Sequence, residues 1–246
     1  MALSSVAEGT VPEAAAEGPW LVLFDIDGTL LSCGPQIRAI FGSALEEVYG
    51  TTGPMEGYDF AGRTDHGIVL DLMTAAGLER RRGLERIAGF GELAVGRLAA
   101  RLDAAEMRLM PGVPDLLRGV NRRADVLLGL LTGNFERGAR VKLGRVGLDE
   151  YFGFGAFGDG AVDRSELPPR AIELARGLAR RSIARERVLV IGDSVLDVRC
   201  ARDHGLRSIA VATGFTSRRE LREAGAHHVL DDLLDAGRCS EVFARP

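Results

Sequence analysis

Two aspartates separated by one residue follow the first strongly apolar run of the sequence. The run covers residues 20–24 (WLVLF), and Asp25 and Asp27 come directly after it in the segment DIDGT. If the chain turns at Gly28, both side chains can face a common site. Asp and Gly also favour ordinary turns, but a turn does not require two acids directly after a buried strand. Because close carboxylates repel each other unless a cation compensates them, the pair indicates a cation-assisted site.

A hydroxyl and two amides follow a second apolar run, residues 126–131. They belong to Thr132, Gly133 and Asn134, where a helix is predicted to begin. The free N–H groups and the dipole of a helix start suit an anion. A plain helix cap at Thr132 or Asn134 would explain the same residues.

Two further aspartates follow the apolar run at residues 188–191. Asp197 lies four residues after Asp193, so the two share a helix face. The helix dipole also favours acids in the first turn, which is the alternative explanation for Asp197. In open α/β sheets ligands bind beyond the carboxyl ends of the strands, so the three groups are predicted to meet. Carboxylates with few other donors suit Mg²⁺, which binds through carboxylates, waters and substrate phosphate.

Alternating strands and helices position these groups. Apolar runs typical of strands buried on both faces cover residues 20–24, 126–131, 188–191, 208–212 and, more weakly, 227–230. Amphipathic stretches typical of helices cover residues 113–123, 135–146, 169–180, 196–203 and 218–224. This order predicts an α/β fold with a doubly wound parallel sheet.

The chain divides into three predicted parts. Residues 1–18 are small and acidic and are predicted to be a flexible leader. Residues 34–108 read as several helices without a buried strand, which predicts an inserted helical domain. Residues 19–33 and 109–246 then form the catalytic core.

The ordered motifs DxDGT, TGN and GDxxxD, each after an apolar run, resemble the haloacid dehalogenase-like (HAD) hydrolase superfamily over residues 20 to about 235. The resemblance is to the phosphoglycolate phosphatase and β-phosphoglucomutase-like branch, with a Rossmannoid core and an α-helical cap. It implies that Asp25 is the nucleophile and that Asp27 is first the general acid and then the base. Mg²⁺ would be held by the Asp25 carboxylate, the Asp27 carbonyl and Asp193, with Asp197 nearby.

The same resemblance implies a phosphate site. Its residues would be Thr132, Gly133 and Asn134, with Gly28 in the turn beside them. In the cap segment GRTDHG, Arg63 could face the substrate when the cap closes. A solvated loop with a helix cap at Thr64 or Asp65 is the alternative.

The family also expects a basic residue, usually lysine, between the second and last motifs, and this chain departs from that pattern. Its only lysine, Lys142, lies ten residues past Thr132, which is too early. Arg164 in DRSELPP takes the role in our interpretation, with Arg170 as the second choice. Arginine binds phosphate bidentately, so an arginine in place of the lysine is compatible with phosphatase activity. An exposed arginine without a role is the alternative.

Composition excludes several functions. With 31 basic and 35 acidic residues the net charge is -4, which gives no positive field for nucleic acid. No apolar run is long enough to span a bilayer, so no membrane partner is predicted. The three cysteines are far apart and are predicted to be reduced, which indicates a cytoplasmic protein.

The sequence therefore predicts a Mg²⁺-dependent phosphatase that acts on a small-molecule phosphate ester through an aspartyl phosphate on Asp25. Asp27 argues against a dehalogenase, which needs no leaving-group acid. A phosphomutase of the β-phosphoglucomutase type uses the same acids and stays open. So does a non-catalytic binding protein of the same fold. The physiological substrate and the oligomeric state are not predicted.

Overall fold

The computed structural model describes residues 18–234, and its centre is a six-stranded sheet. The strand order is β5-β4-β1-β6-β7-β8, and every pairing in this sheet is parallel. The strands are β1 (Trp20–Phe24), β4 (Val126–Leu131), β5 (Gly155–Ala156), β6 (Val188–Gly192), β7 (Arg207–Val211) and β8 (His228–Leu230). The predicted doubly wound α/β fold is confirmed. The predicted leader lies outside the described residues except for Gly18.

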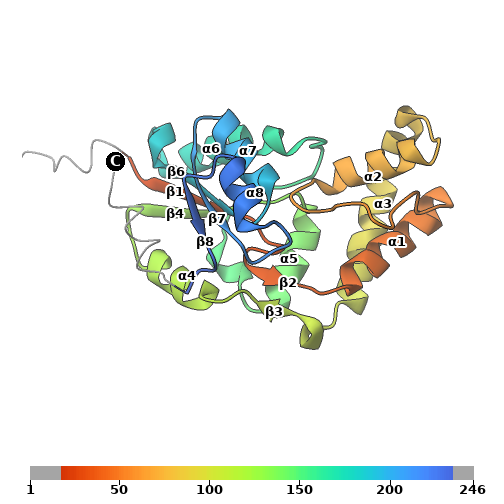
Figure 1. Ribbon diagram of the computed structural model, residues 1–246, viewed down its shortest axis with the longest axis horizontal. Coiled ribbons are helices and arrows are strands. Elements are labelled where there is room, and N and C mark those ends of the chain that lie inside the picture. Colours follow the sequence, from red (N-terminus) through yellow and green to blue (C-terminus); the bar gives the residue numbers. More distant parts are fainter. Residues whose placement is uncertain (1–17, 235–246) are drawn as a thin grey trace, which may run out of the picture.

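Helices cover both faces of this sheet (Figure 1). They are α4 (Val113–Asn121), α5 (Glu136–Arg145), α6 (Leu167–Ala179), α7 (Val195–Asp203) and α8 (Arg218–Glu223). Successive residues of β1 point to opposite faces, because a strand has a period of two. Val22 packs in the cluster that includes Leu117 of α4, while Leu23 packs in the cluster that includes Ala171 of α6. The continuous apolar run of β1 therefore reflects burial on both sides.

Three further helices lie together beyond one end of the sheet, at the right of Figure 1. They are α1 (Gln36–Tyr49), α2 (Asp65–Ala75) and α3 (Arg80–Arg101), and they share an apolar cluster that includes Phe41, Leu72 and Phe90. The chain enters and leaves this part through a short antiparallel ribbon, β2 (Leu31–Ser32) with β3 (Arg108–Leu109). That residues 34–108 form a separate cap domain stays a prediction.

Some elements differ from the sequence prediction. Strand β5 and the β2–β3 ribbon were not predicted, because strands of two residues carry no readable pattern. Helix α6 begins at Leu167, two residues earlier than expected, since Pro168 and Pro169 fall in the first turn, where a missing N–H costs nothing. Short 3-10 turns cover Ala104–Glu106, Asp149–Tyr151, Arg164–Glu166 and Arg185–Arg187.

No helix among residues 18–234 is long and apolar enough to cross a membrane.

Candidate active site

The end of β1 places the first two acids at the carboxyl edge of the sheet. Asp25 is buried, and its backbone N–H donates to the carbonyl of Ile191 on the neighbouring strand at 2.9 Å. Gly28 then turns the chain with φ +87°, a left-handed conformation that favours glycine. A Cβ atom at Gly28 would lie 2.4 Å from a carboxylate oxygen of Asp193. The turn therefore needs glycine both for its backbone and for the approach of Asp193.

Three buried carboxylates meet at this edge. Asp25, Asp193 and Asp197 each offer an oxygen, and these oxygens lie within 4.8 Å of one another. Burial raises the pKa of Asp25 to about 6, although Arg164 lowers it. Burial also raises the pKa of Asp193 well above its ordinary value, and the charges of Asp25 and Asp197 add to this. A divalent cation fits this set, because hard oxygen ligands surround a site with surplus negative charge.

Both carboxylate oxygens of Asp197 are already engaged by protein groups. Its Oδ1 accepts from Arg164, and its Oδ2 accepts from the backbone N–H and hydroxyl of Ser194 at 3.0 and 2.6 Å. The Ser194 hydroxyl also caps α7. Asp197 therefore orients Ser194 and Arg164, and its contact with a metal stays a prediction.

Arg164 lies inside the acidic cluster. Its guanidinium donates to Asp25 Oδ1 at 2.9 Å and to the carbonyl of Leu131 at 2.8 Å, besides Asp197. Its other terminal nitrogen donates to the carbonyl of Gly62, which precedes α2, at 3.0 Å. A capping box between Asp163, which precedes its 3-10 turn, and Glu166, the last residue of that turn, fixes this segment. Only 4% of Arg164 is exposed, so the alternative of an exposed arginine without a role does not hold.

Arg170, the second choice for this role, lies elsewhere. It donates to the carbonyl of Asp159 and pairs with Glu166 on the surface, with 41% of its side chain exposed. The structure therefore brings Arg164 to Asp25 and leaves Arg170 outside.

Lys142 reaches the site, a contact that the sequence interpretation missed. Its ammonium lies 2.6 Å from Asp27 Oδ2 and 2.6 Å from Asn134 Oδ1. The amide of Asn134 donates to the same Asp27 oxygen at 2.8 Å. Burial opposes the charge on Lys142, but Asp27 and its other acidic neighbours outweigh burial and raise the lysine pKa. One signal was available, since Lys142 shares the buried face of α5 with Gly138, Ala139 and Leu143.

The loop after β4 packs tightly against the chain that leads into α2. A Cβ atom at Gly133 would lie 1.9 Å from the carbonyl oxygen of Arg63, and the Gly133 carbonyl accepts from the N–H of Asp65 at 2.7 Å. Thr132 is fully buried, and its hydroxyl accepts from the Asn134 side chain at 2.8 Å. Thr132, Gly133 and Asn134 thus border the acids, while their contact with phosphate stays a prediction.

Two side chains at the start of α2 hold it against backbone groups of residues that follow β4. Thr64 caps α2 and donates to the carbonyl of Val162 at 2.8 Å. Asp65 accepts from the N–H of Phe135 at 2.8 Å, and burial raises the pKa of Asp65 to about 6. The helix cap predicted at Thr64 is therefore present.

Arg63 does not turn its side chain toward the acids in this structure. It pairs with Asp71 at 3.2 Å and lies over the ring of Tyr58, with 43% of the side chain exposed. Only its backbone lies against Gly133. Its role in substrate binding stays a prediction.

The chain is similar in sequence to known hydrolases. Residues 22–202 match the family described as haloacid dehalogenase-like hydrolase. The phosphoglycolate phosphatase of Synechococcus elongatus is 28% identical over 224 residues, which cover 87% of this chain and 95% of that protein. Phosphoglycolate phosphatase 1 of Pseudomonas aeruginosa is 29% identical over 235 residues, covering 95% and 84%.

A solved structure shares the fold. That of a predicted phosphatase from Clostridium acetobutylicum aligns with a TM-score of 0.69 at 21% identity, covering 91% of this chain and 99% of that one. At this identity the likeness concerns the fold alone.

Proposed function

Because this chain belongs to the haloacid dehalogenase-like hydrolase family, we propose that it hydrolyses small phosphate monoesters through a covalent phosphoryl intermediate on Asp25. The chain is a hydrolase, and its similarity to phosphoglycolate phosphatases supports phosphate esters as the substrate class. The observation that carries the proposal is the buried cluster of Asp25, Asp193 and Asp197 around Arg164.

Asp25 is the proposed nucleophile. One of its oxygens attacks phosphorus, the bond from phosphorus to the alcohol oxygen breaks, and an aspartyl phosphate forms. Arg164 holds Asp25 Oδ1 at 2.9 Å, which fixes the direction of attack. Mg²⁺ bound by Asp25, Asp193 and the Asp27 carbonyl would neutralise the charge between the carboxylate and the anionic phosphate.

Asp27 is the proposed proton carrier. It gives a proton to the departing alcohol oxygen and later takes one from the water that attacks phosphorus of the aspartyl phosphate. Lys142 and Asn134 both hold its Oδ2. Among the described residues no hydrogen bond engages Oδ1, which leaves that oxygen for the transfer. We propose that Lys142 acts through Asp27 as a positioning residue.

The remaining residues would frame the phosphate. Thr132 and the loop amides at Gly133 and Asn134 border the acids, and Gly28 lets Asp193 approach. We propose that residues 34–108 form the cap that covers the site, and that Arg63 leaves Asp71 and meets the substrate phosphate when the cap closes.

Phosphate release is the test of this proposal. Purified protein is assayed against phosphate monoesters and sugar phosphates with Mg²⁺ or with a chelator, beside Asp25→Asn. The proposal expects release that needs the metal and is lost in the variant. Isomerised sugar phosphate without release would instead show a phosphomutase. Equal release by Asp25→Asn would overturn the nucleophile assignment.

A further inference from the structure

A cavity of about 50 Å³ lies between the helices of residues 34–108 and the core. Apolar side chains of α1 and α3 form most of its wall, together with Phe135. They are Ile37, Ile40, Phe41, Ala94, Val95 and Leu98. The polar side chains at its lining belong to Asp65, Asn134 and Lys142. The cavity is thus an apolar chamber with one polar side.

The polar side adjoins the proposed proton carrier. Lys142 and Asn134, which line the cavity, both contact Asp27 Oδ2, at 2.6 and 2.8 Å. The departing alcohol must lie within reach of the acid that protonates it. Asp27 is not among the lining residues, so the cavity lies one side chain beyond the proton carrier, in the direction in which we place the alcohol part of a bound phosphate ester.

The cavity offers no free cation to an anionic alcohol part. Among its described lining residues Lys142 is the sole cation, and it is already paired with Asp27. Asp65 adds a carboxylate to the same side. A buried anion without a partner loses its hydration and gains nothing in return. A carboxylate on the substrate would therefore be disfavoured here.

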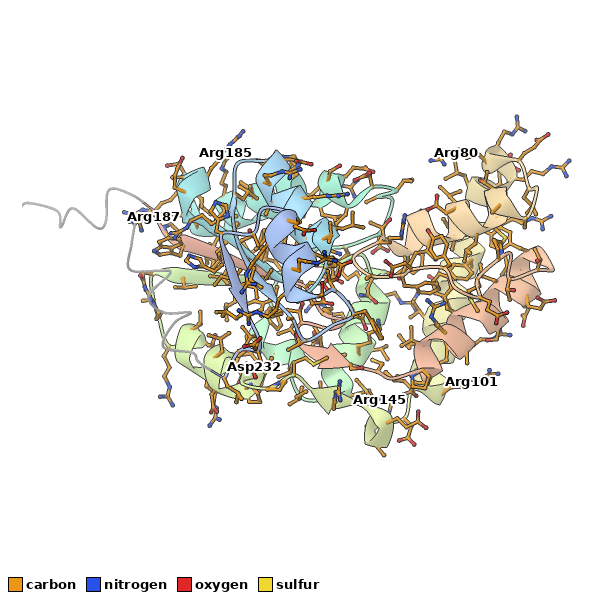
Figure 2. The ribbon with its side chains drawn as sticks, viewed as in Figure 1. Arg80, Arg101, Arg145, Arg185, Arg187 and Asp232 are labelled. Carbon is orange, nitrogen blue, oxygen red and sulfur yellow. The ribbon has the colours of Figure 1, made fainter. Side chains whose placement is uncertain are left out.

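The nearby arginines of α1 and α3 are engaged elsewhere or point outward. Arg38 donates to the carbonyl of Met55, and Arg97 pairs with Glu47. Arg80 lies at the outer end of the three helices, and Arg101, at the end of α3 that meets the core, has an exposed side chain (Figure 2). They cannot serve a carboxylate in the cavity as it stands.

We propose that the substrate is a phosphate monoester of a neutral, largely apolar alcohol, with a short alkyl chain in this cavity. The inference rests on the proposed function and narrows it. The inference predicts that 2-phosphoglycolate is a poor substrate of this chain, because its alcohol part carries a carboxylate. In this respect the chain would differ from the relatives named above, whose names include that substrate.

Binding of two phosphonates tests the inference without turnover. Butylphosphonate and 3-phosphonopropionate are similar in length and cannot be hydrolysed, and they differ in that the second ends in a carboxylate. Calorimetric titration of the wild-type protein with Mg²⁺ should give at least about tenfold tighter binding of butylphosphonate, the discrimination that one or two buried methylene groups provide. Equal or tighter binding of 3-phosphonopropionate, or no binding of either, would overturn the inference. Preferential binding of butylphosphonate without hydrolysis of any ester would instead count against the proposed function alone.

A charge placed in the cavity wall gives a second test. Val95→Lys adds a cation to the lining and should move the preference at least about tenfold toward 3-phosphonopropionate. Leu84→Lys is the matched control, since Leu84 lies on the same helix but is 44% exposed and outside the cavity. Circular dichroism checks that each variant is folded. A shift as large in Leu84→Lys would show a general effect of charge and would contradict the cavity assignment.

Discussion

Arg164 joins two buried acids, and this makes its removal costly. Arg164→Met would leave Asp25 and Asp197 buried without their partner. Breaking a buried ion pair costs about 3 to 5 kcal/mol, so the free energy of unfolding should fall by this order. Urea unfolding measures it. Arg170→Met is the control, because its ion pair is exposed and worth at most about 1 kcal/mol. Equal losses in the two variants would contradict the role of Arg164.

Lys142 acts on catalysis through Asp27 if our proposal holds. Lys142→Met should slow release from alkyl phosphates by roughly 10² to 10⁴, the range of general acid catalysis. Release from p-nitrophenyl phosphate should fall much less, because its leaving group needs no proton. Rates with the two esters are compared in the variant and the wild type. A uniform loss without accumulation of the aspartyl phosphate would show that Lys142 only supports the fold, because Asp27 also acts in the hydrolysis of this intermediate, which both esters share.

At the scale of elements, the contact between the loop after β4 and the chain before α2 depends on Gly133. A Cβ atom in Gly133→Ala would meet the carbonyl of Arg63, so both segments must shift. A displacement of about 1 Å near the chemistry costs roughly 10²-fold in kcat/KM. Gly144→Ala in α5 is the control, since nothing lies within 4 Å of its added atom, and alanine favours a helix. A full rate in Gly133→Ala would refute this contact as a determinant of activity.

The sequence predicted the central strands because their burial on both faces leaves continuous apolar runs. Strand β4 (Val126–Leu131) lies where its run predicted it. Strand β5, by contrast, consists of two small residues, and only its pairing with the neighbouring strand β4 defines it as a strand. Sequence placed Asp25 and Asp193 at one edge, since parallel strands end together. It could not place Lys142, whose destination depends on how α5 packs.

At the scale of the whole molecule, the raised pKa values couple stability to pH and metal. Without metal, burial raises the pKa of Asp25 and of Asp65 from 3.8 to about 6. Between pH 3.8 and about pH 6, the folded protein therefore binds more protons than the unfolded chain. The free energy of unfolding should therefore fall as pH rises through this window.

Mg²⁺ should reverse part of this loss. At a concentration of 100 times its dissociation constant, a ligand adds about 2.7 kcal/mol to stability. The gain should be present at about pH 7.5 and small at about pH 5, because protons compete for Asp25 and Asp193. Urea unfolding with and without Mg²⁺ at both pH values measures it, with Asp193→Asn as the control. A gain independent of pH, or kept in Asp193→Asn, would contradict the metal site.

The covalent intermediate is the central claim, and trapping it is the most direct test. The protein is mixed with Mg²⁺ and a phosphate ester that it hydrolyses, quenched in acid during turnover, digested and analysed by peptide mass spectrometry. We predict a phosphoryl group on Asp25 that hydroxylamine removes, as expected for an acyl phosphate, and that is absent from Asp25→Asn. Phosphate release without any phosphorylated peptide, or a phosphoryl group on another residue, would contradict the account.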